Sequence, residues 1–198
     1  MAVFTPSYPL TLPTATGIKT QNWGLKRVVA MTQSPFTLQQ QVYQHSGEQW
    51  KTTMSLPPML KDNASIWLAF FMQLRGMRGT FKLGDQDRKT IQGTATGTVL
   101  VNGASQTGNQ VALDGFTASR ANVFKAGDYI QINSYLYMVT ENVTANGSGE
   151  ANVKIEPALR NGIEPINNNT TVIYLNTTTI MRLDSNEFNW DTDHVSKY

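Results

Sequence analysis

The chain of 198 residues contains no cysteine and only two histidines. The absence of cysteine excludes disulfides, thiolate zinc sites and cysteine nucleophiles. Charged residues are scarce as well, at 15% of the chain, whereas an average soluble domain has about 25%. A polar but weakly charged surface suits a protein that is covered by neighbouring chains, although many monomeric β-proteins have one too.

Long apolar runs and a basic excess are also missing. The most apolar window, 66–74, is far shorter than the roughly 20 residues that a helix needs to cross a bilayer. The segment 1–6 lacks the basic start and apolar core of a secretory signal. A net charge of +2 gives no surplus for neutralising nucleic-acid phosphates. We therefore expect a soluble protein made in a cytoplasm, without membrane insertion or sequence-specific DNA binding.

Catalytic and cofactor motifs are absent from the sequence. It has no phosphate-binding loop, no dinucleotide fingerprint, no zinc-protease motif and no nucleophile elbow. Asp191-Thr192-Asp193-His194 is the only acid–histidine cluster, and no nucleophile or metal ligand accompanies it. Asp85 and Asp87 lack the further ligands of a calcium loop. The sequence thus predicts a protein that is not an enzyme, with no catalytic, cofactor-binding or metal-binding residue.

Two alternating stretches in the first third of the chain predict a β-hairpin. Thr37–Gln44 and Gln49–Leu56 each place apolar side chains on one face at every second residue. Between them, His45–Glu48 has the composition of a turn, so we expect a four-residue loop there with His45 exposed.

One helix is predicted, over residues 61–75. Asp62 or Asn63 can cap its first amides, and Gly76 is placed for a left-handed end. Apolar residues cover most of its circumference, which favours burial on more than one side. We expect the sheet of the same chain to cover one side and another subunit to cover part of the other; a single large core is the alternative. The candidate subunit-interface residues are Ile66, Trp67, Phe70, Phe71, Arg75 and Arg78.

The middle of the chain predicts a small β-barrel. Short alternating runs separated by Asn-Gly turns are typical of such a unit. The predicted strands are 129–132, 135–140 and 151–155, followed later by 170–175 and 177–183. The stretch 126–139 predicts a hairpin with one face in the barrel and the other exposed or covered by a partner. The candidate recognition residues on the outer face are Tyr129, Tyr135 and Tyr137.

The fold expected from these patterns is mainly β with one helix. We predict a hub domain from residues 1–89 and 161–198, and an inserted small β-barrel domain over 90–160.

Several stretches, taken in order, resemble the distal tail (Dit-like) or tail-hub proteins of long-tailed, siphovirus-like bacteriophages. The resemblance begins with SPFTLQQQVYQHSGEQWKTTMSLPPM (34–59) and WLAFFMQLRGMRGTFKLGD (67–85). It continues through VNGASQTGNQVALDGF (101–116) and most of 124–160. It covers most of the chain, and it is carried by the ordered series, since no single motif is as specific as a metal signature. The chain stops soon after Trp190, where relatives tend to add one more strand.

The resemblance implies a tail-tube-like β-sandwich hub with the barrel displayed outside a ring, commonly of six subunits. Such a ring would join the tail tube to the baseplate or fibre proteins at the virion tail tip and let DNA pass through its lumen. It would be assembled in the host bacterial cytoplasm. Two alternatives remain: another minor tail or tube-completion protein, or a tail-tip module that binds carbohydrate or a receptor.

Overall fold

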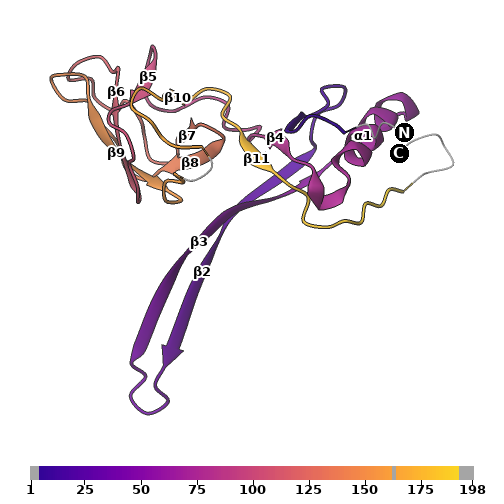
Figure 1. Cartoon of the computed structure of the whole chain (residues 1–198), viewed down its shortest axis with the longest axis horizontal. Helices are drawn as coiled ribbons and strands as arrows, with labels where there is room; N and C mark the ends of the chain where they lie inside the picture. Colours follow the sequence, from indigo (N-terminus) through magenta and orange to yellow (C-terminus); the bar gives the residue numbers. More distant parts are fainter. Residues whose placement is uncertain (1–4, 162–163, 192–198) are drawn as a thin grey trace.

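The computed structural model describes residues 5–161 and 164–191, and this part of the chain is mainly β with a single α-helix (Figure 1). The elements are β1 (Leu10–Thr11), β2 (Thr20–Gln33), β3 (Gln40–Ser55), α1 (Lys61–Leu74), the 3-10 turn η1 (Gly76–Arg78), β4 (Phe81–Leu83), β5 (Val99–Val101), β6 (Gln110–Asp114), β7 (Tyr129–Ile132), β8 (Tyr135–Val139), β9 (Ala151–Glu156), β10 (Thr171–Ile173) and β11 (Thr179–Met181). They form a helix-and-sheet module, a long two-stranded hairpin and a closed barrel, which confirms the expected mainly β class with one helix and a small barrel. The expected β-sandwich hub stays a prediction, and we use hub module only as a name for the helix with its three-stranded sheet.

The hub module consists of α1 packed on a small sheet with the strand order β1-β4-β11. The central strand β4 turns Phe81 and Leu83 toward the helix, and both are almost completely buried. Phe70 of the helix meets Phe81 edge to face, with ring centroids 5.8 Å apart. Chain ends distant in sequence therefore share one core, since β1 pairs with one side of β4 and β11 with the other.

The helix spans Lys61–Leu74, close to the predicted 61–75, but its caps differ from the prediction. Leu60 occupies the N-cap position and makes no side-chain cap bond, so neither Asp62 nor Asn63 has the predicted role. At the other end Arg75 takes the left-handed conformation, with φ 52°, and Gly76 follows with φ 65°. The helix begins at Lys61, earlier than a cap at Asp62 or Asn63 implies. The Pro57-Pro58 pair keeps the preceding segment extended, and the residues from Lys61 onward are not restricted in this way.

The predicted hairpin is wrong: its two strands, 37–44 and 49–56, lie mostly within the single strand β3, and the hairpin that the structure forms pairs β3 with β2. β3 runs unbroken from Gln40 to Ser55 and pairs along its length with β2, so the stretch 45–48 lies within a strand. A register shift between Arg27 and Val29 absorbs the extra residues that made this stretch resemble a loop. The actual turn is at 34–39. His45 packs edge to face on Tyr43, with ring centroids 4.7 Å apart.

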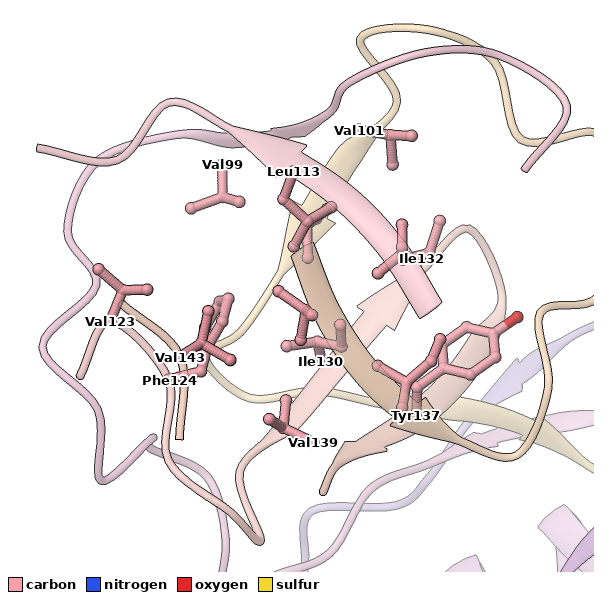
Figure 2. Packing of buried hydrophobic residues seen from close by; sticks show 14 of the residues in the cluster. Val99, Val101, Leu113, Val123, Phe124, Ile130, Ile132, Tyr137, Val139 and Val143 are labelled. Carbon is pink, nitrogen blue, oxygen red and sulfur yellow. The ribbon is translucent and has the colours of Figure 1, made fainter. Parts of the chain in front are cut away.

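The barrel closes through six strands in the order β10-β5-β6-β9-β8-β7, with β10 pairing to both β5 and β7. Its interior is filled by aliphatic side chains together with Phe124 and Tyr137 (Figure 2). Alternate residues of each strand point inward, as Val99 and Val101 do from β5 and Ile130 and Ile132 do from β7. Because β10 completes the barrel, this module extends to residue 173, beyond the predicted boundary at 160.

Two glycines at positive φ lie in turns of the barrel module and differ in the space around them. They therefore allow a matched test of how much a close neighbour adds to the cost of a side chain. Gly149 has φ 77°, and a Cβ there would lie 2.3 Å from the Phe116 carbonyl oxygen; Gly108 has φ 84° with nothing within 4 Å. We expect Gly108→Ala to cost only the backbone strain, about 1 kcal/mol, and Gly149→Ala to cost clearly more because the chain must also move. Urea unfolding of both variants measures the difference; equal losses would show that the turn at Gly149 relaxes freely.

Candidate functional site

The barrel is joined to the base of the hairpin by a junction centred on Trp50. The indole Nε1 of Trp50 donates a hydrogen bond of 2.8 Å to the Leu136 carbonyl oxygen of β8. Its ring meets Trp23 of β2 and Tyr129 of β7 edge to face, both at 6.0 Å between centroids. A single side chain thus connects the hairpin to two barrel strands.

Charged groups reinforce the same junction. The Glu48 carboxylate lies 3.0 Å from Arg27 Nε and accepts a hydrogen bond of 2.9 Å from the Ala158 amide. Arg27 also pairs with Glu156 of β9 at 2.6 Å, and the guanidinium of Arg160 donates to the Glu48 carbonyl oxygen. Since Glu48 is largely buried, its charge is matched both by a cation and by a backbone donor, as a buried carboxylate requires.

The outer face of the β7–β8 hairpin is covered by the rest of the same chain. The Gln131 side chain accepts a hydrogen bond of 2.8 Å from the Thr178 amide, and the amide of Ile180 donates to the Ser134 carbonyl oxygen at 3.3 Å. The Glu164 carboxylate accepts bonds from the amide and hydroxyl of Ser134. The expectation of an exposed or partner-covered outer face is therefore corrected: the chain covers this face itself.

The three candidate recognition tyrosines do not form an outer surface. Tyr137 is fully buried inside the barrel, where its hydroxyl accepts a hydrogen bond of 3.1 Å from the Arg160 amide (Figure 2). Tyr129 is buried against Trp50 at the junction, and Tyr135 is partly buried with the Arg160 guanidinium 5.6 Å from its ring centre. Tyr137 and Tyr129 are thus packing residues, because both faces of their hairpin are covered.

Burial also predicts a pH effect at Tyr137. Desolvation raises the pKa of the Tyr137 phenol above its ordinary value of 10.0, and the Arg160 amide opposes this. A group whose pKa is raised on folding stabilises the native state below its unfolded pKa, and this contribution is lost as the pH rises through the folded pKa. We expect the wild type to lose stability above about pH 10, and Tyr137→Phe to lose less over the same interval. Urea midpoints at pH 8 and in the alkaline range test this; parallel losses in the two proteins would contradict it.

The helix residues named as a subunit interface divide into two groups. Trp67, Phe70 and Phe71 point into the hub core, and each is less than a tenth exposed. Their role is packing within the chain, so they are not surface residues as an interface requires. Ile66, Arg75 and Arg78 lie on the exposed surface. The reason is that the sheet and the segment 182–191 cover the aromatic side of the helix, with Phe188 stacked on Phe71 at 4.4 Å.

The most exposed apolar region is the distal part of the β2–β3 hairpin, residues 28–47, which we call the arm. It projects away from both modules (Figure 1). Every residue of the arm except Ser34 is exposed, and none is Asp, Glu, Lys or Arg. Its exposed large apolar residues are Val28, Val29, Met31, Phe36, Leu38, Val42 and Tyr43. The sequence signal that could have revealed the arm is this charge-free interval of twenty residues.

The tip of the arm is an ordered turn that holds an aromatic side chain in solvent. The Ser34 hydroxyl accepts from the amides of Phe36 and Thr37 at 3.4 and 3.3 Å, and the Ser34 carbonyl accepts from the Leu38 amide at 3.0 Å. Leu38 has φ 56°, a conformation that costs a branched residue energy. The result is that Phe36 is 95% exposed and Leu38 is 67% exposed.

A cleft lies beside the loop 11–18 and the two segments that link the modules. Trp67 Nε1 and Thr16 Oγ1, both in its lining, have no hydrogen-bond partner. Across residues 5–161 and 164–191, no three acidic or histidine side chains are grouped so as to hold a metal ion. Of the Asp191–His194 cluster, Asp193 and His194 lie outside the described residues.

The chain was compared with family models and with curated proteins, and neither comparison found a match. In the described part of the chain, no helix has the length and apolar character that crossing a membrane requires.

Proposed function

We propose that the protein is a structural subunit of the tail tip of a long-tailed bacteriophage and assembles with further copies into a ring. The observation that carries the assembly part is the arm. A two-stranded ribbon is at best marginally stable by itself in water, and exposed strands usually carry charges that prevent association. The arm carries no charge and has seven exposed large apolar side chains, and these features are typical of a surface that another chain covers.

The junction supports the same proposal. Trp50 and Glu48 anchor the base of the arm to the barrel, so the barrel holds the arm at a defined angle to the hub. A rigidly oriented contact is needed for a ring, since copies that meet at variable angles do not close. The tail-tip assignment itself rests on the sequence resemblance over 34–160. In this assignment the hub, with its sheet, helix and arm, is the tail-tube-like part and the barrel lies outside the ring.

The ring would join the tail tube protein to the baseplate hub or fibre proteins and let DNA through without reading its sequence. A recognition role for the barrel has less support, because Tyr129 and Tyr137 are buried. The other alternative, a minor tail or tube-completion protein, differs in position along the tail. Imaging of virions that carry a labelled copy distinguishes the tail-tip proposal from this alternative. Label at the end of the tail distal to the head supports the proposal, and label at the head-proximal end contradicts it.

A measurement of mass in solution tests the ring directly. We expect an assembly whose mass is a fixed multiple of the 22.0 kDa chain and which persists at micromolar concentration. A clean monomer under these conditions would overturn the proposal.

Two adjacent arm positions provide a matched test of how the ring is held. Met31 pairs with Val42 on one face of the ribbon, and Thr32 pairs with Gln41 on the opposite face. We expect Met31→Glu to weaken assembly by about tenfold or more, since a charge would be buried on the apolar face, and Thr32→Glu to weaken it much less. Sedimentation over a concentration series compares them; equal effects would mean that the apolar face is not the one covered.

A further inference from the structure

We infer that the arm, with Phe36 at its tip, docks on the exposed face of helix α1 in the neighbouring copy of the chain. This inference rests on the proposed self-assembly and names the two surfaces that meet. The exposed side of α1 presents Ile66, Ala69 and Met72 at intervals of three residues, and Met77 follows just beyond the helix. We call this the helix face.

The distribution of uncovered apolar side chains singles out these two surfaces. Of the fourteen large apolar residues exposed in the described part of the chain, seven lie on the arm. Four more lie on the helix face or beside it, namely Leu60, Ile66, Met72 and Met77. A chain that presents two such surfaces at once associates with itself unless they are kept apart. The arm points away from its own helix, so one copy cannot satisfy both (Figure 1).

The shapes of the two surfaces are complementary. Phe36 projects from a turn that its hydrogen bonds keep ordered, whereas Ala69 is a small residue between the longer side chains of Ile66 and Met72. An aromatic side chain seated between longer aliphatic ones is a common interface anchor. The lengths agree as well: the six residues 28–33 span about 20 Å, and the fourteen residues of α1 span about 21 Å.

The area required for a stable contact explains why the whole arm takes part. A specific interface covers about 800 Å² on each partner, and one aromatic side chain supplies about 150–250 Å². Phe36 is therefore too small by itself, and the apolar face with Met31 and Val42 must be covered too. The absence of charge over 28–47 allows this, since no ion is left unpaired when water is expelled.

Because the arm and the helix face are different surfaces, the contact is head to tail. Each copy donates one arm and receives another, which generates a closed ring when the rotation between copies is a whole fraction of a turn. The contact also explains why Ile66 is exposed in a helix whose other large apolar side chains are mostly buried.

The cysteine-free chain allows a clean cross-linking experiment. Phe36→Cys and Ala69→Cys are introduced together, and the protein is oxidised and separated without reductant. We expect a ladder of linked chains ending at the size of the ring, because each copy joins the next. The control pairs Phe36→Cys with Leu175→Cys, which is an exposed apolar position, 48% exposed, outside both surfaces. Equal yields from the two pairs, or no ladder from an assembly of wild-type mass, would overturn the inference.

A charge pair provides the second test. Phe36→Lys and Ala69→Glu are each expected to weaken assembly by about tenfold or more, and the double variant to recover much of the loss through the new ion pair. No recovery, with both single variants folded, would place the arm on another surface. A monomeric wild type would instead contradict the proposed assembly into a ring. Failure of the ring and failure of this particular contact therefore give different results.

Discussion

Asp128→Ala is expected to destabilise the barrel by roughly 3–5 kcal/mol. The Asp128 carboxylate is 3% exposed and accepts three backbone hydrogen bonds, from the amides of Gln92, Gly93 and Lys125 at 2.7, 3.0 and 2.8 Å. It ties the segment entering the barrel to the turn before β7. Alanine would leave the three backbone amides without this acceptor, and each lost hydrogen bond to a charged group costs stability.

Amide exchange of the barrel strands and urea unfolding measure this effect. Asp128→Asn retains one acceptor oxygen and should lose less than alanine. Asp184→Ala is the matched control: the Asp184 carboxylate is 85% exposed, and its pair with Lys51 at 2.9 Å lowers its pKa, but an exposed pair is screened by water. A loss at Asp128 no larger than at Asp184 would show that the three amides find other acceptors.

The parts of the fold that could be predicted were those with a local pattern. Short alternating runs between turn residues identified the barrel strands β7, β8, β9 and β10 but missed β5 and β6, and helical spacing identified α1. The position of the hairpin turn could not be found in this way. His45–Glu48 has turn composition, but the pairing of Arg27 with Glu48 and of Val29 with Gln44 keeps β3 continuous. Long-range register overrides a local preference when more than a dozen pairs depend on it.

The placement of the tyrosines shows a second limit. Period-two alternation assigns residues to two faces but does not say which face is covered. The run Tyr135–Val139 is apolar at every position, which is typical of a strand buried on both sides. The tertiary packing of Trp50 and β11 against the outer face decides the matter, and these elements are distant in sequence. The arm was missed for a related reason: the predictions followed where apolar residues stand, whereas the telling feature was where charges are missing.

Trp50→Ala is expected to separate the unfolding of the two modules. The variant would lose the hydrogen bond to Leu136 and the contacts with Trp23 and Tyr129, at a cost of about 3 kcal/mol. Trp50 supplies the aromatic packing of the junction, and the links that remain without it are hydrogen bonds and ion pairs such as Arg27–Glu156 and Glu48–Ala158. We therefore expect the wild type to unfold in one transition and the variant in two.

The distribution of tryptophan makes this separation measurable. All four tryptophans lie outside the barrel strands, although Trp50 packs on the barrel. In Trp50→Ala the three that remain report the hub and the hairpin, whereas amide exchange in β5–β10 follows the barrel. In the wild type the two signals should change together, and in Trp50→Ala they should diverge. Trp50→Phe keeps an aromatic ring and removes the indole donor, so it divides the effect between packing and the hydrogen bond. Coincident transitions in the alanine variant would show that the Glu48 contacts couple the modules without Trp50. Divergent transitions combined with weaker assembly would connect the orientation of the arm to ring closure.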